Sequence, residues 1–295
     1  MERPQNWVFL GDSLTEGVGS SRVSYVSQLA ELLRDAERRK PESDRRPIHE
    51  FRLRRVDPAS FNRFISVNHA GVWNADKTGP AGAIWLWNLG CEGTTVINDL
   101  EWLPLLDNLR PERIFIQRGA VESLVRPEAL IGASWPWWVP PTWRSYAAMD
   151  PRCYFSTISW RRTKQRVVDG LKQRVRLTLL SRGRPSPLMA VSEIEMRLTE
   201  LLAGISPFSG KITLVGLTPV GSETFPGSPV QFREVDRMLA AVAKECGAQF
   251  VDLQGCPDHR FDHPALYYRD RFHPNIVGAR EIALYVASAT GASRG

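Results

Sequence analysis

The sequence predicts an α/β fold in which a parallel sheet is covered by helices on both faces. Short apolar runs alternate along the chain with longer amphipathic segments, and several of the runs end close to a glycine. This alternation is typical of parallel strands joined by crossover helices. The chain has 295 residues, of which 43% are hydrophobic, enough to bury a sizeable core in one domain.

Strands are expected where the apolar runs are short and bounded by turn residues. They span 7–10, 83–89, 113–117, 211–217 and 249–253. Helices are expected where apolar residues recur three or four positions apart. They span 24–39, about 94–109, 192–203, 231–246 and 276–289. Two stretches, at about 40–80 and 123–185, show no clear strand pattern, and we interpret both as insertions into a single domain spanning 1–295.

The formal charge of +6 is too diffuse to indicate a nucleic-acid partner. The density of positive charge is higher in residues 161–184, which contain nine Lys or Arg and one acid. Apolar residues recur there at helical spacing, at Val167, Val168, Leu171, Val175 and Leu179. Such a helix could lie on a membrane surface or an anionic partner, which leaves peripheral membrane contact open. More commonly its apolar stripe packs on the protein's own core.

The sequence contains no run of about 18 apolar residues, so no membrane span is expected. The apolar run at 7–10 is too short for a signal peptide, and we expect a cytoplasmic protein. The four cysteines lack paired spacing, which favours free thiols. A metal site could be drawn from Asp258, His259, Asp262 and His263, but their spacing is not diagnostic. We expect neither a metal nor a cofactor.

Ser13 directly follows the first predicted strand, within Gly11-Asp12-Ser13-Leu14. Open α/β folds carry their chemistry at this carboxyl edge of the sheet. A serine or aspartate here could instead simply cap the helix that follows. A nucleophilic role for Ser13 requires a base elsewhere in the chain.

Asp270 and His273 stand three residues apart, just before the last predicted helix. In a turn, this spacing can place the carboxylate on the imidazole Nδ1 and leave Nε2 free to accept a serine proton. His263, in a similar stretch, is a rival base. We favour His273 because Pro274-Asn275 is a sound helix start and because no acid stands three residues before His263.

Three pieces of the chain resemble, in order, the motifs of the GDSL or SGNH hydrolase superfamily: 11–14, 88–94 and 270–275. The resemblance implies a flavodoxin-like three-layer α/β/α sandwich without a cofactor. It implies that Ser13 is the nucleophile, His273 the base and Asp270 the residue that orients His273. It also implies an oxyanion hole that uses the backbone N–H groups of Ser13 and Gly93. Asn88, in the second motif, is a candidate contact for substrate.

The third block of the family usually reads Gly-x-Asn-Asp, whereas this chain reads Gly119-Ala120-Val121-Glu122. Val121 cannot donate a hydrogen bond to an oxyanion. The variant is similar to SGNH-like proteins encoded among bacterial glycan-biosynthesis genes. Arg126 could replace the missing donor or hold an anionic group of the substrate. It could equally be a surface residue paired with Glu122 or Glu128.

The second insertion carries a run of tryptophans stiffened by prolines: Trp135, Trp137, Trp138 and Trp143. This loop could be a lid over Ser13, a stacking platform for a sugar ring, or a wedge at a membrane surface. It could also simply bury its indoles against the sandwich. Trp135, Trp137 and Trp138 are therefore candidates for substrate binding.

The leading functional hypothesis is a serine-dependent ester hydrolase or O-acyltransferase acting on an acylated small molecule, glycan or lipid. The alternative is a non-catalytic or weakly catalytic binding protein that keeps the fold and associates with glycan or membrane-surface partners. Val121 favours the alternative, and the intact Ser13, Asp270 and His273 favour the enzyme. The sequence does not predict the oligomeric state.

Overall fold

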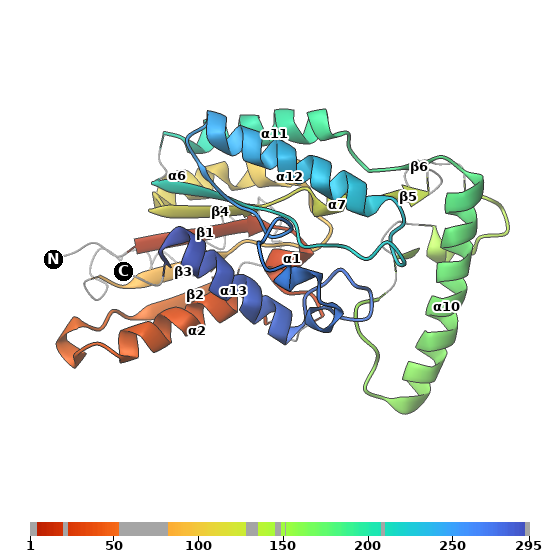
Figure 1. The fold of residues 1–295 in the computed structure, drawn as a ribbon, viewed down its shortest axis with the longest axis horizontal. Coiled ribbons are helices and arrows are strands. Elements are labelled where there is room, and N and C mark those ends of the chain that lie inside the picture. The colour runs from red at the N-terminus through yellow and green to blue at the C-terminus, as the bar shows by residue number, and fades with distance from the viewer. Residues whose placement is uncertain are drawn as a thin grey trace.

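The central sheet has six parallel strands in the order β2-β3-β1-β4-β7-β8 (Figure 1). The computed structural model describes residues 5–19, 23–52, 82–127, 135–144, 149–150, 152–207 and 210–292. The strands of the sheet are β1 (Gln5–Gly11), β2 (Ile48–Arg52), β3 (Ile84–Asn88), β4 (Arg113–Gln117), β7 (Lys211–Val215) and β8 (Gln249–Val251).

The five strands predicted from the sequence are all present, as β1, β3, β4, β7 and β8. Their order, β3-β1-β4-β7-β8, is the flavodoxin-like order 2-1-3-4-5. The predicted fold class is therefore confirmed.

The prediction that 40–80 is an irregular insertion is wrong at its start, because β2 lies there and adds a sixth strand at the edge of the sheet. Its register against β3 runs from Ile48 opposite Ile84 to Arg52 opposite Asn88. All five residues of β2 are only half-buried, and three of them are polar or charged. An edge strand of this composition shows no continuous apolar run. Residues 53–81, the rest of this predicted insertion, lie outside the described residues.

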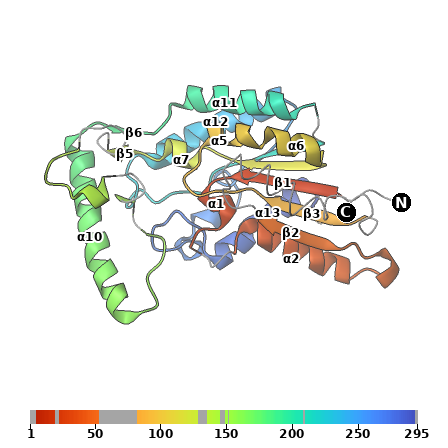
Figure 2. The same ribbon diagram turned by 180° about the vertical axis from the view of Figure 1, so that it is seen from behind.

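Helices cover both faces of the sheet and complete three layers (Figures 1 and 2). Two hydrophobic clusters, one on each face, form the core. One face carries α5 (Val96–Asp99), α6 (Leu103–Leu109), α11 (Val191–Ile205) and α12 (Ser228–Glu245). The other face carries α2 (Tyr25–Arg38) and α13 (Ile276–Thr290), which pack against each other. The short helices α1 (Ser13–Glu16) and α7 (Ala120–Ser123) follow β1 and β4.

The helix expected at about 94–109 is in fact broken into α5, a 3-10 turn at Leu100–Trp102, and α6. Pro104 stands at the second position of α6, where its missing N–H is not needed. Proline would disrupt a continuous helix through 94–109, because its ring clashes with the carbonyl four residues earlier. The break leaves Asp99 at the end of α5, fully buried.

The second insertion contains a long helix, α10 (Ser159–Arg182), that stands beyond the carboxyl ends of the strands (Figures 1 and 2). A small antiparallel pair, β5 (Arg126–Pro127) and β6 (Pro185–Ser186), closes the base of this insertion. The apolar stripe of α10 does not pack fully on the core as expected, because Val167 and Leu171 are 68% and 51% exposed. The buried residues of α10 are instead Asp169 and Arg176. Among the described residues, none of the helices combines the length and apolarity that crossing a bilayer requires.

Candidate active site

Ser13 is the first residue of α1, at the carboxyl end of the central strand β1. The capping role belongs to Asp12, whose Oδ1 accepts a hydrogen bond from the Leu14 N–H at 2.9 Å. The Ser13 hydroxyl is therefore not needed as a cap. Its Oγ lies 2.9 Å from His273 Nε2. The chain thus brings together two residues 260 positions apart.

His273 lies in the turn that precedes α13, and Asp270 holds it from the other side. The Asp270 Oδ2 to His273 Nδ1 distance is 2.7 Å, and Asp270 Oδ1 accepts from the backbone N–H groups of Phe272 and His273. Because an ionised carboxylate only accepts, Nδ1 carries the hydrogen and Nε2 accepts the Ser13 proton. Asn275 caps α13 with its side chain, as expected for a helix that starts here.

The environment of His273 changes its basicity in two opposing directions. Burial alone lowers the pKa, but the hydrogen bond and negative charge of Asp270 outweigh it, and the net pKa of His273 is raised above 6.5. The His273 imidazole is therefore a stronger base than an ordinary histidine.

The pKa of the buried Asp12 carboxyl is also raised, chiefly by burial, although the positive charge of Arg118 opposes this.

A pH profile tests this assignment. Only neutral His273 can accept a proton, so kcat/KM for a neutral activated ester should fall as pH falls through the His273 pKa, with a midpoint above 6.5. In Asp270→Asn the supporting charge is lost, and the midpoint should move to lower pH. Initial rates of 4-nitrophenyl acetate hydrolysis across the pH range measure both midpoints. A midpoint that Asp270→Asn leaves in place would show that the titrating group is not His273.

A cavity of about 300 Å³ opens beside this triad. Its volume is at the lower end of the range for small-molecule sites. The lining comprises Ser13, Val18, Glu92, Gly93, Val121, Leu124, Arg126, Asp150, Arg152, Cys153, Tyr154, Phe225, Asp270, Phe272 and His273. Of the residues predicted from the sequence, Ser13, Gly93, Arg126, Asp270 and His273 meet here.

Asn88, a candidate substrate contact, does not reach this cavity. It is buried, and its side chain binds the Thr15 carbonyl, the Ser24 hydroxyl and the Gly90 N–H at 2.9 to 3.2 Å. Gly90 lies so close to α1 that a Cβ there would be 2.5 Å from the Glu16 nitrogen. Asn88 and Gly90 therefore fix the second motif against the helix that carries Ser13, and in this structure the Asn88 side chain makes a structural contact where the sequence suggested a contact with substrate.

The tryptophans of the second insertion, for which a lid was one of several interpretations, do not line the cavity either. None of Trp135, Trp137 and Trp138 is among the described lining residues, and Trp137 is 89% exposed. The prediction that they contact a substrate at Ser13 is therefore not supported by the described part of the chain. Trp138 is also exposed, at 47%, whereas Trp135 is half-buried.

Arg126 is a buried residue and not a surface one. Its Nη1 donates to the Val121 carbonyl at 2.7 Å, and its Nη2 lies 3.4 Å from Asp150 Oδ2. Arg176, also buried, approaches the other oxygen of Asp150 at 3.7 Å. One carboxylate therefore faces two arginines at the wall of the cavity. The Val121 side chain, at the position of the family asparagine, lines the same wall.

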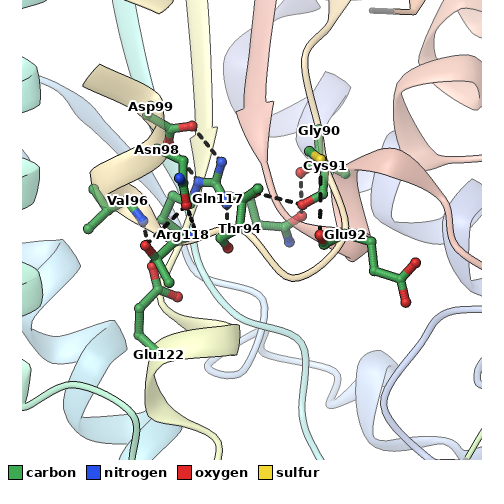
Figure 3. A network of polar contacts seen from close by, with 12 residues as sticks. Gly90, Cys91, Glu92, Thr94, Val96, Asn98, Asp99, Gln117, Arg118 and Glu122 are labelled. Carbon is green, nitrogen blue, oxygen red and sulfur yellow. Dashed lines mark hydrogen bonds and ion pairs between the residues drawn. The ribbon is translucent and has the colours of Figure 1, made fainter. Parts of the chain in front are cut away.

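Arg118, which sequence reasoning missed, organises the loop that carries Gly93 (Figure 3). Its guanidinium binds both oxygens of Asp99 at 2.5 and 2.6 Å and donates to the Thr94 carbonyl and hydroxyl. Both ions are buried. Glu122 Oε1 accepts a hydrogen bond from the Val96 N–H at the start of α5. Burial raises the pKa of Glu122 to about 7, although the positive charge of Arg118 lowers it. A single arginine before a glycine gives no recognisable signal in the sequence.

Cys153, from the second insertion, also lines the cavity beside the triad. Burial, with the charge of Asp270, raises the pKa of its thiol to about 12, so it is protonated at neutral pH and is no rival nucleophile. The ligating atoms of Cys153, Asp270 and His273 lie within 4.8 Å of one another and could hold a soft cation.

The chain is similar in structure to known hydrolases, although its sequence matches no protein-family model and no curated protein. One similar structure is Axe2, an acetylxylan esterase from Geobacillus stearothermophilus, with a TM-score of 0.53 and 15% identity over 98% of this chain and 95% of that one. Another is LAE5, an alpha/beta hydrolase enzyme from the metagenome of Lake Arreo, Spain, with a TM-score of 0.51 and 18% identity over 100% and 99%.

These similarities extend over nearly the whole of each chain. With the sheet order, they confirm the three-layer α/β/α fold that the sequence predicts. At this identity the likeness concerns the fold, and function has to be argued from the site.

Proposed function

We propose that this protein is a serine-dependent ester hydrolase or O-acyltransferase. The observation that carries the proposal is the continuous chain of hydrogen bonds from Asp270 through His273 to Ser13, with distances of 2.7 and 2.9 Å, at the border of a cavity. A nucleophile, a base and an orienting carboxylate in this arrangement suit acyl transfer. The substrate is an acylated small molecule, glycan or lipid.

In the first half of the reaction, Ser13 Oγ attacks the acyl carbonyl while His273 Nε2 takes the serine proton. Asp270 holds the resulting imidazolium by its Nδ1–H and stabilises its charge. The tetrahedral intermediate then collapses: the bond to the alcohol breaks, and His273 returns the proton to the leaving oxygen. Ser13 is left as an ester of the acyl group.

In the second half, a water molecule or an acceptor hydroxyl attacks this acyl-enzyme. His273 takes its proton and gives it to Ser13 Oγ as the intermediate collapses. Water yields the free acid, and a hydroxyl yields a new ester. The same triad performs both reactions, so the choice depends on which nucleophile reaches the acyl group.

The developing oxyanion needs donors, and we assign this role to the backbone N–H groups of Ser13 and Gly93. Both residues line the cavity, and Gly93 has a positive φ of 71°, which glycine adopts without strain. Arg118 and Asp99 fix the loop that follows Gly93, through Thr94. Preorganised donors of this kind are usually the largest single source of transition-state stabilisation.

The structural comparisons support the same proposal. Variants of Axe2 that are described as catalytic mutants replace one histidine, one serine and one aspartate. Those are the residue types that meet in this chain at Ser13, Asp270 and His273. The acylated carbohydrate that the name of Axe2 implies is one member of the proposed substrate class.

Val121 provides a gain-of-function test. Val121→Asn places an amide on the cavity wall where the family has its third oxyanion donor. We expect turnover of a small activated ester to rise by up to about a hundredfold, the worth of one such donor. Val121→Leu, which adds bulk without a donor, is the control and should not raise the rate. Equal rates for wild type and Val121→Asn would argue against an oxyanion hole beside Val121.

Val121 also supports a second candidate, a binding protein that keeps the fold without efficient chemistry. The two candidates differ in whether Ser13 is activated. A fluorophosphonate, which reacts with activated serines, should form a covalent adduct at Ser13 if the proposal is correct. A folded protein that remains unlabelled would favour the binding protein.

A further inference from the structure

A second cavity, which we call the basic cleft, lies between α10 and the segment that leads into it. Its volume is about 440 Å³. Four cationic side chains line it: Arg152, Arg161, Lys164 and Lys172. Ser156, Trp160, Gln165 and Val168 supply polar and apolar wall between them. The proposed ester chemistry makes no use of this cleft.

Among the described lining residues of the basic cleft, the four cations outnumber the acids, so the cleft has a net positive charge. Asp169 is the one acid among the described lining residues, and it forms an ion pair with Arg269 from outside the cleft. The pKa of Lys172 is lowered chiefly by burial; the charge of Asp169 opposes this shift, and the charge of Arg152 adds a smaller lowering. Cations that crowd in this way gain free energy when an anion lies among them.

The walls of the cleft are held in place by contacts of their own. Gln165 on α10 donates to the Tyr154 carbonyl at 2.8 Å and accepts from the Ser156 N–H at 2.9 Å. The guanidinium of Arg269 packs on the ring of Phe155 at 3.7 Å and donates to the Arg152 carbonyl at 2.7 Å. The segment 152–156 is therefore fixed to both α10 and the loop that carries Asp270.

The basic cleft adjoins the triad cavity, because Arg152 lines both. One molecule could place an ester at Ser13 and an anionic group among the four cations. A carboxylate would engage one arginine fork, whereas a phosphate or pyrophosphate carries enough charge and acceptor oxygens for several Lys and Arg donors.

We propose that the basic cleft binds a phosphate or pyrophosphate group of the substrate whose acyl ester lies at Ser13. The inference rests on the proposed function and narrows its substrate class to phosphate-bearing acyl esters. The phosphate could belong to a water-soluble ester or to a lipid.

Binding is tested by isothermal titration calorimetry with inorganic pyrophosphate and by sedimentation with phosphatidylglycerol vesicles. We expect Arg161→Gln/Lys164→Gln to weaken the affinity by about tenfold for each cation removed, and added salt to weaken it further. Arg174→Gln, on an exposed position of α10 that lines neither cavity, is the matched control. Binding of pyrophosphate would indicate that the phosphate group belongs to a water-soluble ester. Binding of vesicles without binding of pyrophosphate would indicate that it belongs to a lipid. The absence of both, or equal weakening in Arg174→Gln, would overturn the proposal.

The link to catalysis is tested with two matched esters, 6-O-acetylglucose and 6-O-acetylglucose 1-phosphate. We expect kcat/KM to favour the phosphorylated ester by at least about tenfold, and the ratio to fall toward one in Arg161→Gln/Lys164→Gln but not in Arg174→Gln. If wild type turns over both esters equally, the inference fails while the proposed function stands. If Ser13 is also not labelled by a fluorophosphonate, the proposed function fails. Any pyrophosphate binding by such a protein would then be unrelated to an ester substrate.

Discussion

Replacement of His273 by alanine is expected to lower kcat for an activated ester by about 10⁴-fold or more, the scale on which a triad base contributes. Without the imidazole, the Ser13 hydroxyl has no acceptor for its proton, and the leaving alcohol has no donor. Since the side chain of His273 is only 16% exposed and bonded on both sides, the melting temperature should be measured beside the rate to separate lost chemistry from lost folding.

The matched control is His263→Ala. The ring of His263 is on the surface, where its Nδ1 accepts only a local hydrogen bond from the Ala265 N–H at 3.2 Å. The variant should keep most of the wild-type rate. Steady-state hydrolysis of 4-nitrophenyl acetate by the two variants decides the matter. A greater loss in His263→Ala than in His273→Ala would contradict the assigned triad.

The largest expected effect on stability comes from Arg118→Met. This change leaves Asp99 fully buried without the cation that binds both of its oxygens. Removing one partner of a buried ion pair costs about 3 to 5 kcal/mol of unfolding free energy. Because Arg118 also holds Thr94 next to Gly93, the surviving folded protein should have a reduced kcat. Urea unfolding followed by circular dichroism gives the free energy.

Three comparisons make this result specific. Arg38→Met, which removes the exposed Arg38–Asp35 pair, should cost less than about 1 kcal/mol. The double variant Arg118→Met/Asp99→Leu should be more stable than Arg118→Met alone, because no unpaired charge remains buried. Burial raises the pKa of Asp99, so in Arg118→Met the stability should be highest at low pH, where Asp99 is protonated, and decline as pH rises. A single variant as stable as wild type at neutral pH would refute the role of the pair.

The sequence predicts the layers of the fold because four strands, β1, β3, β4 and β7, are largely buried and therefore appear as apolar runs, as in Arg113–Gln117. The edge strand Ile48–Arg52 is half-buried throughout and carries polar residues, so this rule does not detect it. The break after Asp99 agrees with Pro104, which the sequence shows, but the pairing of Asp99 with Arg118 joins two distant parts of the chain. Local spacing cannot indicate such a tertiary ion pair.

The triad could be predicted because its two halves are local motifs: a strand followed by Gly-Asp-Ser, and Asp-x-x-His before a helix. The roles of Asn88 and Arg126 could not, because each depends on what surrounds the side chain after folding. The Asn88 side chain is hydrogen-bonded to neighbouring backbone groups, and Arg126 is buried beside Asp150. Cys153 and Arg152 come from an insertion whose position over the site becomes visible only in three dimensions.

Intact-mass spectrometry after exposure to a fluorophosphonate tests most directly whether Ser13 is an activated nucleophile. We expect wild type to gain the mass of one phosphonyl group, and peptide mapping to place it on Ser13. Ser13→Ala should gain none, and His273→Ala should react far more slowly, because the serine has lost its base. A folded wild-type protein that gains no mass, or gains it at another residue, would contradict the proposed mechanism.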